Sequence, residues 1–217
     1  MADIFHEVDE EVRRERLQKL WDRYSIYVIA LGVLIVSAIG GWRGYEYWEA
    51  KKAAAAGAAF ESALNLSEAG KHAEAESAFA KIAAEAPAGY RILARLRAAA
   101  ELAQINSADA VKAYDELAAD SSLGAALQDL VAVRAAMLTV DNGPLSEMQR
   151  RLDSVAEPGR AFRHNARELL ALSAWRNHDF TAARRYIDMI ATDAETPPGT
   201  RARTDVLSAL IAADGKS

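Results

Sequence analysis

The residue types that most often carry catalysis are few in this chain and form no recognisable constellation. There is no cysteine, so thiol nucleophiles, thiolate metal sites, iron–sulfur clusters and disulfides are all excluded. The sequence contains no metal-binding, phosphate-binding or serine-hydrolase motif. The four histidines are scattered along the chain: His6, His72, His164 and His178. We therefore predict a protein that is not an enzyme and that has no catalytic, metal-binding or cofactor-binding residues.

Neighbouring carboxylates are equally poor candidates for acid–base chemistry. Glu74 and Glu76 are two residues apart, and Asp115 and Glu116 are adjacent. Side chains at these spacings point in different directions from an α-helix, so they do not converge on one reacting atom. We interpret both pairs as parts of solvated helix faces.

The composition predicts an all-α protein. Of the 217 residues, 48 are alanine, about 22%, whereas β-branched residues are scarce. Alanine has the highest helix propensity and lets helices pack closely, so a sheet-based enzyme is disfavoured. The 26 Lys and Arg against 31 Asp and Glu give a net charge of −5, and the Arg-rich N-terminal stretch is itself net acidic. Both facts argue against a nucleic-acid partner.

One uncharged segment is long enough to cross a membrane. Residues 24–42 read YSIYVIALGVLIVSAIGGW and contain no charge. As a helix these residues would extend about 28 Å, close to the thickness of a bilayer's hydrocarbon core. A cleaved signal peptide is the main alternative, because Ala38-Ile39-Gly40 has small residues at a suitable spacing. A buried core helix is disfavoured because such helices are rarely apolar all round at this length.

The residues around this segment support a retained transmembrane helix. Aromatic side chains flank both ends, as at membrane–water interfaces: Trp21, Tyr24 and Tyr27 before it, and Trp42, Tyr45, Tyr47 and Trp48 after it. Small residues four apart could let a second helix pack closely, which would be a weak packing site: Ser37, Gly40, Gly41 and Gly44. Residues 24–42 are thus predicted to contact the lipid bilayer directly.

Basic residues near the segment predict its orientation. Five lie on the N-terminal side, namely Arg13, Arg14, Arg16, Lys19 and Arg23. Three lie on the other side, namely Arg43, Lys51 and Lys52. The excess favours a cytoplasmic N-terminus and a translocated C-terminal part. We expect a cytoplasmic leader at 1–23, a transmembrane helix with its flanks at 24–48, and a periplasmic helical repeat domain at 49–217.

The C-terminal part contains a repeated pattern of a small residue, then a larger apolar residue four positions on, at intervals of about 35 residues. Ala75 and Phe79 form the first copy, and Ala110 and Tyr114 form the second, 35 residues later. Ala183 and Ile187 form a third copy a further 73 residues on, about two periods, and the unit between, near Leu145 to Val155, is degenerate. Such a period is typical of helical hairpins that stack in an α-solenoid. The small residues would mark close helix crossings, and the larger ones would fill the space between hairpins.

The turns before these helices resemble those of tetratricopeptide repeats. Gly70-Lys71-His72-Ala73-Glu74-Ala75 and His178-Asp179-Phe180-Thr181-Ala182-Ala183 are similar to the turn that leads into the second helix of such a repeat. The first helices lack the usual glycine and tyrosine, so the repeats are divergent. We expect the apolar helix to continue to about Ala69, and a closing helix at 200–213 to bury Val206, Leu207, Leu210 and Ile211. Solenoids usually bind through their first helices, where exposed charge would be offered by Arg95, Glu101, Arg134 and Arg167.

The whole arrangement resembles the YfgM-type family of ancillary subunits of the bacterial SecYEG translocon. The resemblance rests on the leader, the span ending in GWRGYEYW at 41–48, the helix with AFESAL at 59–64, and the divergent repeats. It implies a single-pass inner-membrane protein that links secretory translocation to periplasmic chaperones. Its partners would be translocon subunits, a membrane-anchored periplasmic chaperone and emerging secretory chains. The alternative is a periplasmic scaffold of cell-envelope assembly or division, anchored or released by cleavage.

Overall fold

The structure, a computed structural model, describes residues 3–214 and divides the chain into two compact units, Met1–Ala54 and Ala55–Ser217. The predicted leader starts with residues 1 and 2, which lie outside the described residues. Every regular element in the described part is helical, which confirms the all-α prediction. The predicted domain boundaries after residues 23 and 48 stay predictions.

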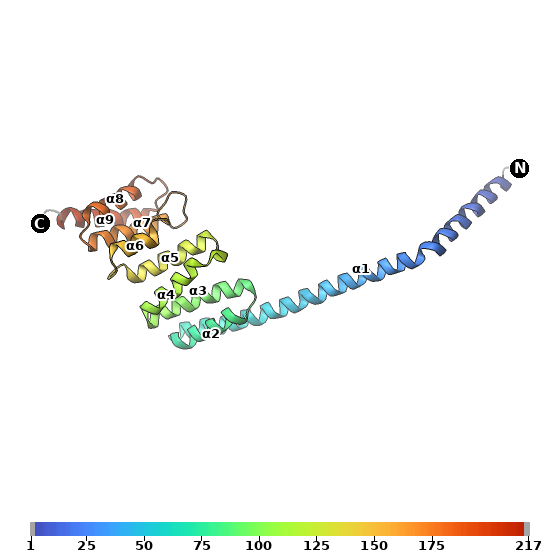
Figure 1. Cartoon of the computed structure of the whole chain (residues 1–217), viewed down its shortest axis with the longest axis horizontal. Coiled ribbons are helices and arrows are strands. Elements are labelled where there is room, and N and C mark those ends of the chain that lie inside the picture. Colours follow the sequence, from blue (N-terminus) through green and yellow to red (C-terminus); the bar gives the residue numbers. More distant parts are fainter. Residues whose placement is uncertain (1–2, 215–217) are drawn as a thin grey trace. The chain divides into compact units, whose positions relative to one another are not determined.

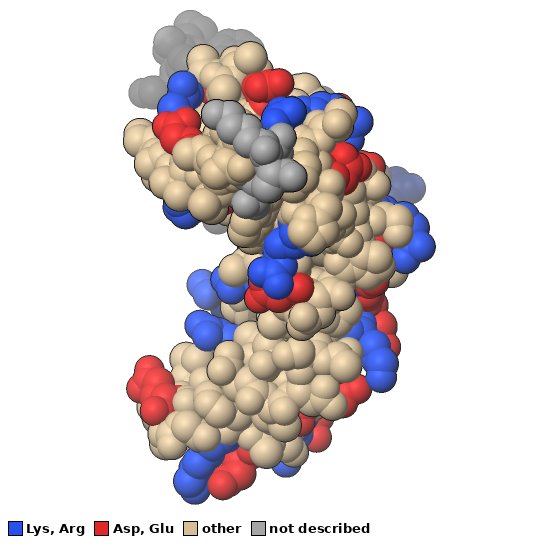
Figure 2. Space-filling view, turned by 90° about the vertical axis from the view of Figure 1, so that its left-hand side faces the viewer, with Lys and Arg blue, Asp and Glu red and all other residues tan. Residues whose placement is uncertain are grey.

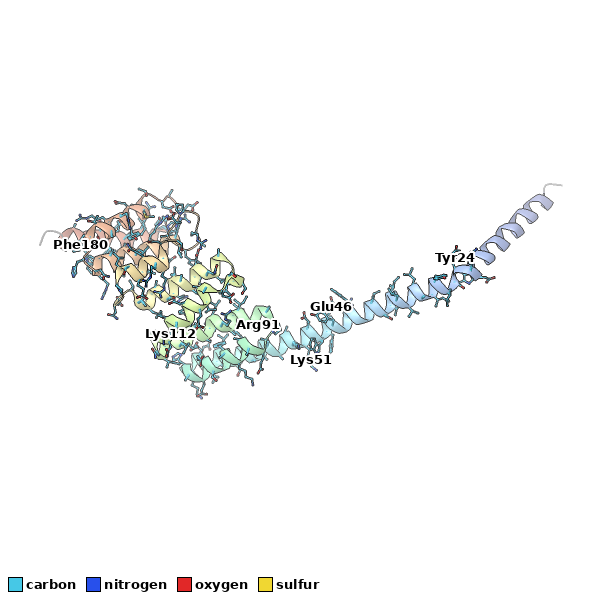
Figure 3. The ribbon with its side chains drawn as sticks, in the orientation of Figure 1. Tyr24, Glu46, Lys51, Arg91, Lys112 and Phe180 are labelled. Atoms are coloured by element: carbon cyan, nitrogen blue, oxygen red, sulfur yellow. The ribbon has the colours of Figure 1, made fainter. Side chains whose placement is uncertain are left out.

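The first element, α1 (Asp3–Glu68), is a single helix of 66 residues that contains the uncharged segment. Its part Trp21–Glu68 is, in the described chain, the one helix long and apolar enough to cross a membrane by length and composition. The side chains of Tyr24, Glu46 and Lys51 project outward from it (Figure 3). Beyond the uncharged segment, Glu46 accepts a 2.9 Å hydrogen bond from the Trp42 indole.

The second unit consists of helical hairpins stacked in chain order (Figure 1). The last turns of α1 pair with α2, α3 with α4, α5 with α6 and α7 with α8, and α9 closes the series. The helices are α2 (His72–Glu85), α3 (Ala88–Ile105), α4 (Ser107–Ala119), α5 (Ala125–Thr139), α6 (Leu145–Leu152), α7 (Arg163–Arg176), α8 (Phe180–Ala191) and α9 (Pro198–Asp214), with a short 3-10 turn η1 (Ser121–Leu123) before α5.

The turns inside the first and last hairpins have the same backbone geometry. Gly70 and His178 both adopt positive φ, +73° and +59°. The next residue's N–H then bonds the carbonyl five residues back, Lys71 to Leu66 and Asp179 to Ala174, both at 2.9 Å. This Schellman-type arrangement satisfies carbonyls that a helix end would leave unpaired. The two turns that resemble each other in sequence are therefore alike in structure.

The closing helix differs from the prediction on one face. It begins at Pro198 rather than Thr200, and Leu207 and Ile211 are buried as expected. Val206 and Leu210, by contrast, are 62% and 44% exposed, so the prediction that they face inward was wrong. The reason is that a helix at the end of a stack has neighbours on one side only, and residues one position before Leu207 and Ile211 lie about 100° around the helix.

A test of the hairpin core is the replacement Ala183→Leu. Ala183 is fully buried in α8, so a larger side chain would overpack the core and lower the free energy of unfolding by about 1–3 kcal/mol. Ala191→Leu, at the exposed C-terminal end of the same helix, is the control and should change stability little. Thermal or urea unfolding of the two variants measures the difference. An Ala183→Leu protein as stable as the control contradicts a close crossing at this position.

Candidate protein-binding groove

A surface groove runs along the first helices of consecutive hairpins in the second unit. Its volume is about 540 Å³. We call it the first-helix groove, and it is lined by Phe60 of α1, Leu93, Leu96, Arg97 and Ala100 of α3, Tyr114 of α4, and Leu130, Val131 and Arg134 of α5. Most of these side chains are apolar, so the groove offers a surface that a protein segment can cover.

Helical spacing explains why α3 contributes most of the lining. Leu96, Arg97 and Ala100 follow Leu93 by three, four and seven positions, which places all four on one face of the helix. Ala94 and Ala99 point into the core and are essentially inaccessible. Leu93 is 51% exposed because it is on the groove side and has no neighbour over it. A helix packed on one side and open on the other is what binding through this face requires.

Aromatic packing holds Phe60 in place at one end of the groove. Its ring lies edge-on to Phe79, with 5.1 Å between centroids, and 6.0 Å from Tyr90. Such aromatic pairs contribute about 0.5–1.5 kcal/mol beyond the burial of their area. Gly57, one turn earlier on α1, leaves room for Tyr90, because a Cβ at Gly57 would lie 2.9 Å from the tyrosine oxygen. Phe60 is therefore a well-packed wall at this end of the groove.

The charged side chains of the groove are both basic. Arg134 is exposed on α5, and Arg97 is exposed on α3. Tyr114 is buried apart from 5% of its surface, and this burial raises the pKa of its phenol while the nearby Arg134 lowers it. The phenol therefore stays protonated at neutral pH. The groove can pair with carboxylates, but it holds no acid–base couple.

The residues predicted to define the repeats lie in the cores of three hairpins. Ala75, Ala110 and Ala183 have no exposed surface. Phe79 and Tyr114 are buried four positions later, in α2 and α4. In α8 the buried residue is Tyr186, three positions after Ala183, while Ile187 is partly buried against the same core. The role of these residues in defining the repeat stays a prediction.

Of the four charged residues expected on the binding face, only Arg134 lines the groove. Glu101 is 4% exposed and joins three helices: the Ser67 hydroxyl donates to it at 2.6 Å, and His72 Nδ1 lies 2.7 Å from its other oxygen. Arg95 bonds Asp120 at 2.5 Å. The expectation that Glu101 binds a partner was wrong, because desolvated charges need internal partners and cannot also serve a ligand.

Arg167 is also structural rather than surface-exposed. It is 3% exposed, donates to the Ala156 carbonyl and ion-pairs Asp193 at 2.8 Å, joining α7 to the segment after α8. Arg163 bonds the same Asp193, and these hydrogen bonds hold the pKa of that carboxyl far below its usual range. The prediction of Arg167 as a binding residue was wrong for the same reason as for Glu101.

Nothing in the described part of the chain assembles a catalytic or metal site. His164 is 8% exposed, and burial lowers its pKa. Its neighbour Thr196 donates its hydroxyl to the Ile190 carbonyl at 2.8 Å, so it is not poised as a nucleophile. Among the side chains that the structure describes, which exclude those of residues 1–20, no group of three or more acidic or histidine residues is placed to hold a metal ion.

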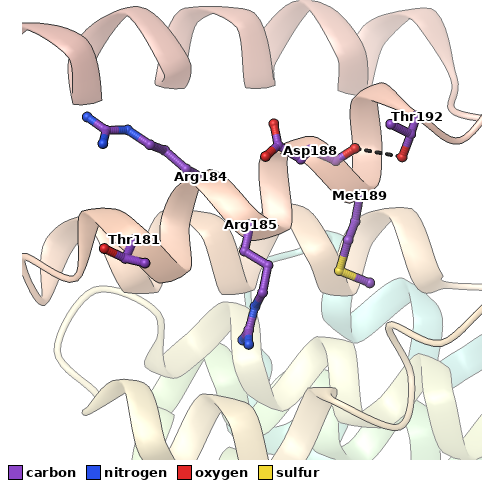
Figure 4. Close-up of a pocket in the computed structure, with 6 residues that line it drawn as sticks. All are labelled: Thr181, Arg184, Arg185, Asp188, Met189 and Thr192. Atoms are coloured by element: carbon purple, nitrogen blue, oxygen red, sulfur yellow. Dashed lines mark hydrogen bonds between the residues drawn. The ribbon is translucent and has the colours of Figure 1, made fainter.

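A second surface hollow, of about 460 Å³, lies along the exposed face of α8. Arg184 and Arg185 leave the helix in opposite directions (Figure 4). The Thr192 hydroxyl donates 2.7 Å to the Asp188 backbone carbonyl and is therefore occupied within the helix. Because its side chains diverge, this hollow is a weaker candidate than the first-helix groove.

On the face of the second unit that Figure 2 shows, Lys and Arg are interspersed with Asp and Glu, with uncharged surface between them. A nucleic-acid site would need a continuous basic face.

The small residues of α1 meet no second helix in the described chain. Apart from the adjacent residues and the helix's own backbone, no atom lies within 4 Å of the place where a Cβ would stand on Gly40, Gly41 or Gly44. Helix packing at Ser37 and these glycines therefore stays a prediction.

Antiparallel hairpins stacked in series, with an open groove along their first helices, define an α-solenoid of the protein-binding kind. The sequence matches the model of the tetratricopeptide repeat-like domain over residues 18–195, which includes the apolar segment and the helices through α8. The chain belongs to this family, and the predicted solenoid class is confirmed. Domains of this family are generally non-enzymatic modules for protein interaction. Searches of curated proteins and of solved structures give no significant match.

The groove residues that sequence reasoning missed are Leu93, Leu96, Arg97, Ala100, Leu130 and Val131. The helical spacing of the α3 residues can be read from the sequence. The same spacing is equally typical of a helix face that packs against the core, so it does not by itself indicate a groove. Only the packing of α3 on its neighbours separates its buried Ala94 and Ala99 from the exposed Leu93 and the partly buried Leu96.

The Arg95–Asp120 pair near the groove predicts a pH dependence. Hydrogen bonds from Arg95 and Ser122 lower the pKa of Asp120 from 3.8 to about 2. A carboxyl whose pKa is lower in the folded state stabilises the fold above its unfolded pKa, and this stabilisation is lost as pH falls through its folded pKa. Asp120→Asn should therefore be less stable than wild type at pH 7. The difference in free energy of unfolding should shrink below about pH 4 and vanish below about pH 2.

Urea unfolding followed by circular dichroism, at several pH values, measures this difference. Glu116→Gln is the control, because Glu116 is exposed on α4 and has no hydrogen bond or ion pair within the described residues. A stability difference between Asp120→Asn and wild type that is independent of pH would contradict the assigned role of the pair.

Proposed function

We propose that this protein is a membrane-anchored, non-enzymatic module that binds other proteins through the first-helix groove. The observation that carries the proposal is the apolar, partly exposed lining contributed by three successive first helices. Membership in the tetratricopeptide repeat-like family supports a protein ligand. The uncharged part of α1 supports an anchor, because it has the length and composition of a membrane span.

The finer proposal concerns the place of action. The chain resembles the YfgM-type ancillary subunits of the SecYEG translocon in its leader, its single span and its divergent repeats. On that basis the protein resides in the bacterial inner membrane, with residues 1–23 in the cytoplasm and residues 49–217 in the periplasm. There it contacts translocon subunits and a membrane-anchored chaperone, and it helps transfer emerging secretory proteins to periplasmic folding factors.

Orientation can be tested with single cysteines, because the native chain has none. Asp22→Cys places a thiol before the span. Ala119→Cys places one at an exposed position of α4. In spheroplasts, a membrane-impermeant maleimide should label Ala119→Cys at once and Asp22→Cys only after permeabilisation. The reverse pattern contradicts the orientation. A mature chain that begins near Gly40 would instead identify a cleaved signal peptide and a released scaffold.

The partners can be tested by site-specific photo-crosslinking in native membranes. A photoreactive amino acid at Leu93 places the probe in the groove, and the same residue at Glu116, exposed on α4 and outside the groove lining, is the control. We expect Leu93 adducts that contain translocon subunits or a membrane-anchored periplasmic chaperone, identified by mass spectrometry.

Two results would count against the proposal. Adducts that are equally abundant from Glu116 would show that the groove is not the binding surface. Groove adducts that contain only unrelated proteins would remove the translocon assignment and leave a protein-binding module of another envelope process.

A further inference from the structure

The first-helix groove has a charge character that differs from that of the whole chain. The protein carries a net charge of −5, yet the only charged side chains in the groove lining are Arg97 and Arg134. They come from α3 and α5, two helices that share one apolar core cluster around Ala99 and Val131. The groove is thus a basic patch on an acidic protein.

Several other arginines of the second unit form ion pairs that join its elements. Arg151 bonds both oxygens of Asp115, at 3.1 and 2.7 Å, and Arg160 bonds Asp129. Arg203 bonds both oxygens of Glu168. Within residues 21–214, no hydrogen bond or ion pair engages the guanidinium of Arg97 or Arg134.

The acidic residues on the same two helices do not compensate these charges. Glu101 of α3 is buried against Ser67 and His72, and Asp129 of α5 is 3% exposed and paired with Arg160. No carboxylate lines the groove. Two free guanidiniums beside apolar side chains are therefore left to an external ligand, and guanidinium groups pair well with carboxylates in two-point geometry.

We infer that the groove selects protein segments in which carboxylates flank apolar side chains. This inference rests on the proposed function and specifies the partner's chemistry. Leu93, Leu96 and Leu130 provide the apolar contact, and Arg97 and Arg134 provide two charged contacts on different helices. A peptide can place carboxylates on both sides of an apolar stretch, whereas a phospholipid carries its charge at one end. Complementary charge also speeds association and excludes basic segments.

The test uses the full chain in detergent and short fluorescent peptides of leucine and glutamate, with leucine–lysine and serine–glutamate peptides for comparison. The leucine–glutamate peptide should bind best, and its affinity should fall as salt is raised. The double variant Arg97→Glu, Arg134→Glu should weaken this binding by roughly tenfold, as expected for losing two partly exposed charge pairs. Arg91→Glu, which reverses an exposed arginine of α3 outside the groove lining, should bind like wild type.

A folding defect would weaken the binding of every peptide. If the double variant is folded, it should instead bind the leucine–lysine peptide better than wild type does. Equal binding of acidic and basic peptides by wild type, or an unchanged affinity in the double variant, overturns the inference. Binding of phosphatidylglycerol vesicles through Arg97 and Arg134 without peptide binding overturns it as well.

The two proposals fail in different ways. If Leu93 photo-crosslinks to the same proteins in wild type and in the double variant, the protein-binding groove stands and its acidic preference is wrong. If Leu93 gives no protein adducts at all in wild type, the groove function itself is wrong.

Discussion

Close contact between helices at alanine positions is the constraint on which the second unit depends. Ala75, Ala110 and Ala183 have no exposed surface, so each of these helices is covered by its neighbours at the alanine. Helices packed this tightly leave little room for an internal cavity. The site described here is accordingly a surface groove, formed where first helices of successive hairpins lie side by side with one face open.

Charged groups then divide into two sets with different roles. Buried or half-buried pairs such as Glu101 with His72 and Arg167 with Asp193 connect elements distant in sequence, and removing one partner would leave an uncompensated charge. These groups specify how the hairpins stack. Arg97 and Arg134, which form no ion pair with a described residue, lie in the groove and give it a sign opposite to that of the chain.

The two units use apolar side chains in opposite ways. In α1 the large residues of the uncharged segment are exposed around the helix, among them Ile26, Val33 and Val36 at 65%, 61% and 70%. A membrane would solvate such a surface, whereas water would not. In the second unit, large apolar residues such as Phe79, Met148 and Leu170 are fully buried. The overall hydrophobic content of 51% therefore combines an exposed apolar helix with the buried cores of the hairpins.

The all-α class, the apolar segment and the solenoid of hairpins could be read from the sequence, because helix propensity, uncharged length and a repeat of about 35 residues are local or periodic properties. The groove could not. The leucines of α3 and its alanines follow compatible helical spacings, so only the neighbouring helices decide which face is covered. Whether an arginine or glutamate is free or paired depends on residues about 30 positions away, as Glu101 with His72 shows. Tertiary packing alone buried Glu101 and Arg167, exposed Val206 and Leu210, and left Arg97 and Arg134 without an ion-pair partner among the described residues.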